Sequence, residues 1–142
     1  MAKSFREIVA WQLAFELDEK VVRLIASSPQ AQRNFDYRNQ LTDASQGVHS
    51  NIAEGHGRYR PAEIARFLDI AMGSLNETET RLRSGVVSGY FKPEDVGPLI
   101  LLAARCRTAT SHWNAYLQRV RNDPRFLPKK KGRSQNLCDE PL

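Results

Sequence analysis

Histidines and paired carboxylates often carry catalysis or bind metals, and few of them stand at useful spacings in this 142-residue sequence. The chain has three histidines, His49, His56 and His112. His49 and His56 are seven residues apart, which on one helix places them two turns apart, too far for the usual close pair of zinc ligands. His112 stands beside Trp113 and is interpreted as a surface or core histidine. We therefore expect no metal site and no cofactor.

Three glutamates are the best candidates for a carboxylate mechanism. Glu54, Glu77 and Glu79 would approach one another if the helices that carry them pack antiparallel. However, their nearest charged neighbours in the sequence are arginines, and a nearby arginine favours the charged form of a carboxylate over a tuned acid and base pair. The sequence also contains no phosphate-binding glycine loop, nucleophile elbow or zinc signature. We therefore expect a protein that is not an enzyme.

The two cysteines fit neither a disulfide framework nor a zinc-binding spacing. Cys106 falls within a helical pattern and is predicted to be a small core residue. Cys138 lies in a polar region and is predicted to be an exposed thiol with no deducible role. No segment approaches the apolar length of a membrane span, and no signal-peptide block follows Met1. A cytoplasmic protein without membrane contact is therefore expected.

Positive charge is concentrated near the end of the sequence. The formal net charge is +5, and the run from Arg125 to Arg133 holds basic residues but no acid, so that it alone accounts for this excess. The remainder sums to zero, which weakens a nucleic-acid interpretation of the folded part. The last helical segment is nevertheless basic, with no acid between Val96 and Asn122. Together these stretches supply the candidate nucleic-acid contacts Arg105, Arg107, Arg119, Arg121, Lys129, Lys130 and Lys131.

The elements that position these charges are organised around a corner at residues 51–58, Asn-Ile-Ala-Glu-Gly-His-Gly-Arg. A left-handed glycine is expected to cap the incoming helix, and Pro61 suits the first turn of the next one. Glu54 and Arg58 would form either an exposed ion pair or a partly buried polar lock. A ligand or partner site is the alternative to a structural role. The proposed structural motif comprises Asn51, Glu54, Gly55, Gly57 and Arg58.

Apolar residues recur at helical spacing in four segments, about residues 5–27, 36–54, 61–88 and 93–122. The first has a broad apolar stripe, including Phe15 and Val22, behind a capping box that begins at Ser4. Residues 30–34 are predicted to be a polar connection. Gly73 in mid-helix costs about 1 kcal/mol relative to alanine and predicts close packing against another helix. Gly85 is expected only to loosen a helix end.

These segments predict an all-α, up-down-up-down antiparallel four-helix bundle with short loops. Residues 1–122 would form the four-helix bundle domain. Residues 123–142, with their prolines and lysines, would form a basic and largely disordered C-terminal tail.

The corner sequence Asn51-Ile52-Ala53-Glu54-Gly55-x-Gly57-Arg58, with Arg66-Phe67-Leu68 and Gly73-Ser74-Leu75 behind it, resembles the four-helix bundle proteins encoded by 23S rRNA intervening sequences (S23-type). This resemblance implies a homopentamer with no established enzymatic activity. Related accessory proteins of diversity-generating retroelements use a basic pentameric surface to bind nucleic acid and a reverse transcriptase. Relatives commonly carry two arginines after a Gln-Leu pair, where this chain has Thr42-Asp43, so a contribution to that surface is missing here.

The expected function is that of a non-catalytic oligomeric scaffold or accessory protein. It would bind RNA or DNA through the basic fourth helix and tail, by charge and not by base reading. The alternative is a protein–protein interaction module with no nucleic-acid binding, which presents Trp11 or Phe67 to an unidentified protein partner. A third interpretation is a small-ligand pocket at the polar corner, near Asn51, Glu54 and Arg58.

Overall fold

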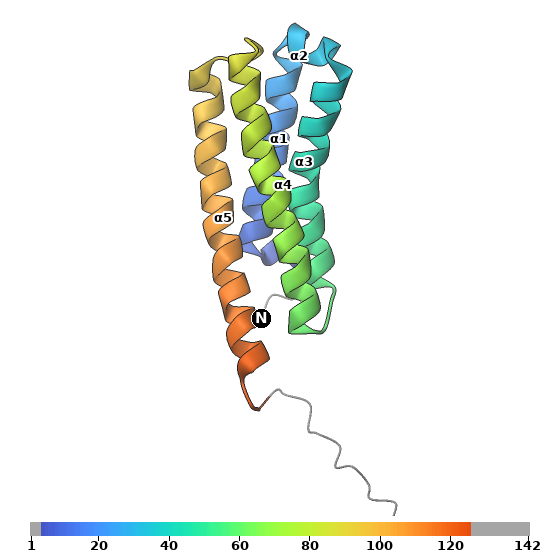
Figure 1. Cartoon of the computed structure of the whole chain (residues 1–142), viewed down its shortest axis with the longest axis vertical. Coiled ribbons are helices and arrows are strands. Elements are labelled where there is room, and N and C mark those ends of the chain that lie inside the picture. Colours follow the sequence, from blue (N-terminus) through green and yellow to red (C-terminus); the bar gives the residue numbers. More distant parts are fainter. Residues whose placement is uncertain (1–3, 126–142) are drawn as a thin grey trace, which may run out of the picture.

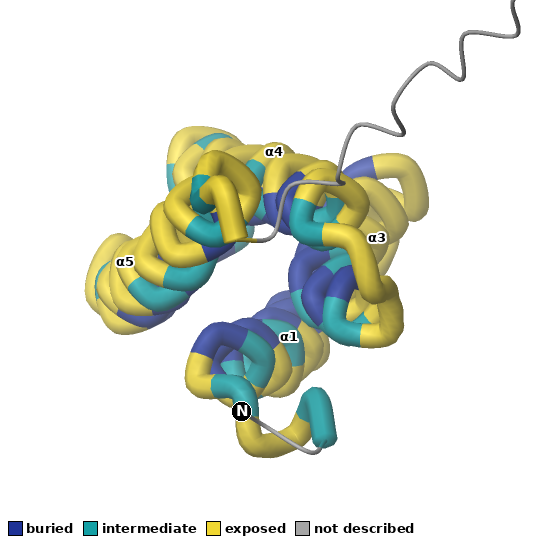
Figure 2. The backbone as a smooth tube through the Cα atoms, turned by 90° about the horizontal axis from the view of Figure 1, so that it is seen from below, coloured by how far each residue is buried: buried dark blue, intermediate teal, exposed yellow. Residues whose placement is uncertain are grey.

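The computed structural model describes residues 4–125, which form helices and contain no strand. The four long helices run alternately in opposite directions as an antiparallel bundle (Figure 1). Each long helix packs against two others: α1 (Val9–Ala26) and α4 (Pro61–Val87) both pack against α3 (Phe35–His56) and α5 (Pro93–Asn122) (Figure 2). The all-α helical bundle is thus confirmed. The elements in chain order are η1 (Phe5–Glu7), α1 (Val9–Ala26), α2 (Pro29–Arg33), α3 (Phe35–His56), α4 (Pro61–Val87) and α5 (Pro93–Asn122).

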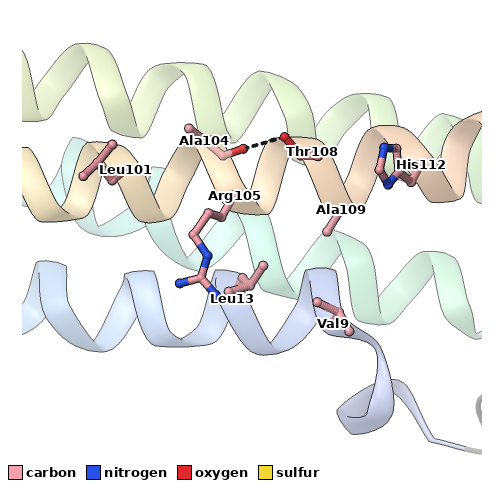
Figure 3. A pocket seen from close by; sticks show the side chains of 8 residues that line it. All are labelled: Val9, Leu13, Leu101, Ala104, Arg105, Thr108, Ala109 and His112. Carbon is pink, nitrogen blue, oxygen red and sulfur yellow. Dashed lines mark hydrogen bonds between the residues drawn. The ribbon is translucent and has the colours of Figure 1, made fainter.

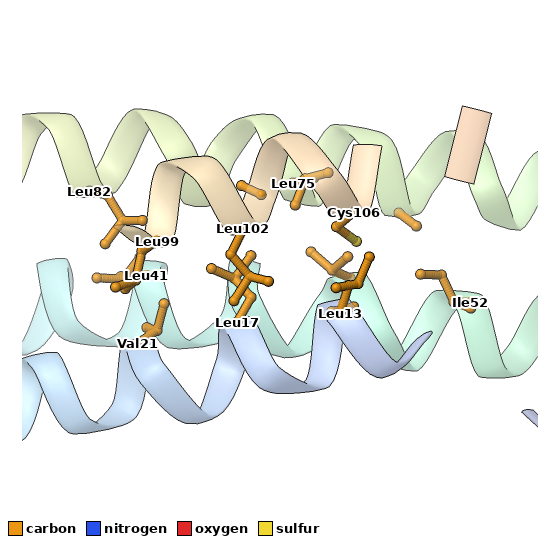
Figure 4. Packing of buried hydrophobic residues seen from close by; sticks show 14 of the residues in the cluster. Leu13, Leu17, Val21, Leu41, Ile52, Leu75, Leu82, Leu99, Leu102 and Cys106 are labelled. Atoms are coloured by element: carbon orange, nitrogen blue, oxygen red, sulfur yellow. The ribbon is translucent and has the colours of Figure 1, made fainter. Parts of the chain in front are cut away.

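Leucines from all four long helices fill the interior of the bundle (Figure 4). Their burial follows from the spacing of three and four residues that lines up one apolar face on each helix. Removing these side chains from water is the main driving force for the fold. Fully buried examples from three of the helices are Leu17, Leu41, Leu68, Leu75 and Leu82.

The first predicted helix is divided in two, which corrects the single helix expected over residues 5–27. Residues 5–7 form the short 3₁₀ turn η1, and Ile8 is extended, with φ −77° and ψ 120°. The predicted hydroxyl cap is present, but Ser4 Oγ accepts from Arg6 N (3.3 Å) and so caps η1 and not the long helix. Phe15 and Val22, predicted to belong to the apolar stripe, are 39% and 49% exposed. Part of the broad apolar stripe therefore remains exposed on the surface of the chain.

The segment predicted to be a polar connection, residues 30–34, is mostly the short helix α2. It begins at Pro29, and Ser28 Oγ accepts a hydrogen bond from Ala31 N (3.2 Å). Serine at the N-cap followed by proline at the first helical position is a helix-start signal. Asn34 then caps α3 in the same way, accepting from Tyr37 N (3.1 Å), so the two helices follow one another directly.

The corner glycines do not adopt the left-handed conformation that was predicted. Gly55 lies inside α3, and Gly57 caps it with φ −75° in the right-handed region. Within residues 4–125 the only positive φ belongs to Gly89, at 76°, in the turn between α4 and α5. A Cβ on Gly55 would lie 3.1 Å from Phe67 Cβ, so the glycine lets α4 approach α3 closely. The prediction of a left-handed glycine was wrong because it considered only the backbone angles that glycine allows and not the close packing of the two helices.

The close helix contact expected at Gly73 is also absent. Gly73 is exposed, and a Cβ there would meet no atom of the described chain within 4 Å. The close approaches occur instead at Gly47, where a Cβ would lie 2.9 Å from Ser74 Oγ, and at Gly85. Gly85 is buried, and a Cβ there would overlap the Tyr37 hydroxyl and the ring of Phe91. It therefore fixes the packing of the helix end that it was expected to loosen.

The helix α5 ends at Asn122, where the domain boundary was predicted. Most of the predicted disordered tail, residues 126–142, lies outside the described residues. Between residues 4 and 125, each helix is too short or too polar to cross a lipid bilayer.

Candidate nucleic-acid interface

The polar corner is built around Arg58, which lies between a glutamate of its own turn and an aromatic ring of α4. Arg58 Nη2 is 2.5 Å from Glu54 Oε1, and its guanidinium carbon is 5.1 Å from the centroid of the Phe67 ring. Both members of the ion pair are well exposed, which makes the pair itself worth little. Of the two predicted arrangements, the exposed ion pair is the one observed. Stacking on Phe67 adds a contact that joins the corner to α4.

The side chain of Asn51 makes its hydrogen bond within α3. Its Nδ2 donates to Gly47 O (2.7 Å), one turn earlier on the same helix. Gly47 and Gly55 both lie where α3 and α4 approach closely, and Gly57 ends α3 by donating its N–H to Ala53 and Glu54 carbonyls. Of the five motif residues, Gly55 and Arg58 therefore meet α4 at Phe67, whereas the hydrogen bonds of Asn51 and Gly57 stay within α3.

The predicted phosphate contacts on α5 point to two opposite flanks of that helix. Arg107 Nη2 binds α4, at 3.2 Å from Glu79 Oε2 and 3.1 Å from Asn76 Oδ1. Arg105 extends the other way, towards α1 (Figure 3). Residues fourteen apart lie close to four full turns apart and share a flank, so Arg121 follows Arg107 and Arg119 follows Arg105. The helix therefore offers no single face with all four arginines.

Arg119 and Arg121 instead lie at one end of the bundle, with the α3–α4 corner. We call residues 57–66 and 119–125 together the turn end. Figure 1 shows that the last turn of α5 and the corner lie towards the same end. Of its six exposed arginines, Arg58 and Arg125 form ion pairs, and the other four have no hydrogen bond or ion pair through the side chain within residues 4–125. These are Arg60, Arg66, Arg119 and Arg121.

Negative charge at the turn end is partly neutralised. Asp123 Oδ2 lies 2.6 Å from Arg125 Nη2, and this contact holds the pKa of the Asp123 carboxyl below its usual range. Glu54, just before the turn end, is paired with Arg58, whereas Glu63 within the turn end is exposed. Cations are also favoured in the last turn of α5 because the exposed carbonyls there carry partial negative charge. The turn end is therefore a surface on which unpaired guanidinium groups predominate. The predicted contacts Lys129, Lys130 and Lys131 lie outside the described residues.

Sequence reasoning missed a polar cluster between α1 and α3. Asp18 Oδ1 accepts from Ser45 Oγ (2.7 Å), and Asp18 Oδ2 lies 2.8 Å from His49 Nε2. The His49 ring also packs edge-on against Phe15, with centroids 5.1 Å apart. The available signal was an aspartate inside a broad apolar stripe, which requires polar partners when half-buried. His49, considered only for metal binding, is thus a contact between helices.

This cluster contains the residue types of a hydrolytic triad but not its connections. In a triad the serine hydroxyl donates to the imidazole, which then acts as general base. Here the hydroxyl of Ser45 donates to the Asp18 carboxylate and to the Thr42 carbonyl oxygen (3.1 Å). Ser45 is also fully buried, out of reach of a substrate. The geometry therefore does not activate a nucleophile.

Cys106 is buried, as predicted for a small core residue. Its Sγ lies 3.5 Å from the carbonyl oxygen of Ala10 on α1. Burial raises the pKa of the thiol to about 11, so it stays protonated at neutral pH. A protonated and inaccessible thiol packs the core and does not act as a nucleophile.

Comparison with known proteins agrees with the fold. The sequence model of a family described as 23S rRNA-intervening sequence protein matches residues 6–111. Among solved structures, the chain is similar to a protein of unknown function from the S23 ribosomal protein family of Bacteroides thetaiotaomicron. The two share 20% identity with a TM-score of 0.60, over 81% of this chain and 100% of that chain. At this identity the likeness shows the fold alone. No curated protein sequence matches.

Proposed function

The chain belongs to the 23S rRNA-intervening sequence protein family, and we propose that it is a non-catalytic accessory protein that binds nucleic acid through the turn end of its bundle. The observation that carries the proposal is the gathering of unpaired arginines where the chain leaves α5 towards Lys129, Lys130 and Lys131. A guanidinium that is already paired, such as Arg107 with Glu79, is less available to bind a phosphate.

The chemistry that fits this surface is contact with the phosphate backbone. Guanidinium groups on exposed helix ends bind phosphate oxygens and release the counterions that surround nucleic acid. Contacts of this kind carry no sequence information. We therefore propose binding to RNA or DNA with weak sequence preference and a steep dependence on salt.

Fluorescence anisotropy with a structured RNA and a duplex DNA, at low and physiological salt, tests this proposal. The full-length protein is compared with a chain that ends at Asn122. Binding by both with a steep salt slope supports a phosphate-binding surface on the bundle, whereas binding by the full-length protein alone assigns the activity to the tail. No binding at low salt by either protein rules out the nucleic-acid function.

We further propose that the protein assembles as a homopentamer, as the resemblance implies. Support comes from the outer face of α1, where Phe15 and Val22 are exposed and Trp11 stacks on Phe15 with centroids 4.8 Å apart. Positions 11, 15 and 22 share one face of the helix. Contiguous exposed apolar side chains of this kind mark interaction surfaces. Light scattering coupled to size-exclusion chromatography tests the assembly, and a monomeric mass at all concentrations contradicts it.

The same α1 face favours a second candidate function, a protein-interaction module with no nucleic-acid binding. The other predicted anchor, Phe67, is partly covered by Arg58 within the chain and is the weaker candidate. Binding to a partner protein that is insensitive to salt but lost in Phe15→Ala would support this function. Binding that falls steeply with salt and is unchanged in Phe15→Ala would support the nucleic-acid function instead.

A further inference from the structure

A shallow groove runs between α1 and α5 on the outside of the bundle (Figure 3). Its volume is about 660 Å³. Val9 and Leu13 line it from α1, and Leu101, Arg105, Thr108 and Ala109 are among the residues that line it from α5. It lies on a different helix pair from the α3–α4 corner. The surface is therefore separate from the structural motif and from the paired charges between α4 and α5.

The groove combines apolar side chains with one central positive charge. Val9 and Leu101 are 59% and 68% exposed, although both are apolar. Arg105 extends across the groove towards Leu13 (Figure 3), and its guanidinium has no hydrogen bond or ion pair within residues 4–125. This arrangement fits a short segment in which apolar residues flank acidic ones.

The chain itself contains one such segment. Residues 137–142 read Leu-Cys-Asp-Glu-Pro-Leu, and Asp139 and Glu140 are the only acids in the sequence after Asp123. Two leucines flank the two acids, as two exposed apolar residues flank Arg105 along the groove. Thr108 lies about 21 Å from the end of α5, measured along the helix axis. Residues 123–136 can span about 46 Å when extended, so the segment reaches the groove without moving the bundle.

We propose that residues 137–142 dock in the α1–α5 groove of their own chain. Asp139 and Glu140 face Arg105, and the leucines contact the exposed apolar residues. Tethering favours this occupant because a linker of this length holds the segment at an effective concentration on the order of millimolar. Docking does not depend on the basic run 129–133 binding nucleic acid.

A cysteine pair tests the docking directly. Cys106 is buried and has a raised pKa, so Cys138 serves as the reactive thiol. In the Thr108→Cys protein, oxidised glutathione should form an intrachain disulfide with Cys138 about tenfold faster than in the Ser50→Cys protein. Ser50 is exposed on α3, outside the groove, and serves as the control. Equal rates, or a disulfide between two chains, overturn the proposal.

Charge reversal separates docking from random encounter. Adding Arg105→Glu to the Thr108→Cys protein should reduce its rate to that of the Ser50→Cys control. Adding Asp139→Lys and Glu140→Lys as well should restore it, because the charges again attract. If Arg105→Glu leaves the rate unchanged, or if the added lysines do not restore it, the assignment of the acids to Arg105 is contradicted. No nucleic acid is present in this assay, so its failure is distinct from failure of the proposed function.

Discussion

His49 Nε2 lies 2.8 Å from Asp18 Oδ2, and this contact joins α3 to α1 at the border of the apolar core. Asp18 also accepts from Ser45, which is fully buried. The carboxylate therefore satisfies polar groups of two positions on α3, and it allows a polar cluster to exist beside a leucine-rich interior.

Asp18→Ala should destabilise the fold, because it leaves Ser45 and His49 without their shared acceptor. We expect a loss of about 1–3 kcal/mol in the free energy of unfolding, measured by urea denaturation. Glu19→Ala, at an exposed position next in the sequence, is the control and should change stability by less than about 0.5 kcal/mol. Equal effects of the two substitutions would show that the cluster does not hold α1 to α3.

Alanine should have opposite effects at two glycines of α4. Gly85→Ala forces a methyl group into the Tyr37 hydroxyl and the Phe91 ring, and it should lower the free energy of unfolding by about 1–3 kcal/mol. Gly73→Ala meets open space and should raise it by about 0.5–1 kcal/mol, because alanine favours the helix. Denaturation of both variants measures the difference. A loss of stability in Gly73→Ala would indicate that another chain covers this position.

Stability should fall at alkaline pH, because burial raises the pKa of Cys106 from 9.0 to about 11. The unfolded chain loses this proton first, so the stabilisation is complete below about pH 9 and is lost as pH rises through the folded pKa. The contribution of Cys106 to the slope between pH 9 and 11 is about 1.4 kcal/mol per pH unit. Cys106→Ala should remove this contribution. Burial also raises the pKa of Tyr37, from 10.0 to about 12. The loss of stability that this causes begins near pH 10 and should remain in Cys106→Ala.

Arg107→Ala should weaken the fold slightly and leave nucleic-acid affinity almost unchanged. Its ion pair with Glu79 is partly exposed, so we expect a loss of about 0.5–1 kcal/mol in denaturation experiments. Affinity should persist because this guanidinium is already bound to α4. A loss of RNA or DNA binding in anisotropy as large as that of Arg121→Ala would instead place Arg107 in the phosphate contact.

Helical periodicity predicted the bundle well because each long helix buries one apolar face. Two features of the helices and the role of one glycine were not predicted. The break at Ile8 and the short helix α2 depend on local caps at Ser4 and Ser28, which compete with a longer regular helix. The role of Gly55 depends on Phe67 of the next helix, which no local rule reveals.

Side-chain partners were the part of the candidate site that the sequence could not supply. Arg105 and Arg107 are two residues apart and look equivalent, yet one faces the groove and the other binds Glu79. Helical phase places them on different flanks, but only the packing order of the helices decides what each flank meets. The partnership of Asp18, Ser45 and His49 likewise requires α1 and α3 to be neighbours. The unpaired arginines of the turn end come from separate helices for the same reason.

The most direct test of the proposed function compares charge reversal at the two ends of the bundle. Arg119→Glu with Arg121→Glu alters the turn end, and Arg33→Glu with Lys92→Glu makes the same charge change at exposed positions of the opposite end. The turn-end variant should lower the slope of log affinity against log salt by about 2 for RNA or DNA, and the control should keep the slope of the unaltered protein. Equal losses in both variants, or no loss in the turn-end variant, would contradict a phosphate-binding turn end.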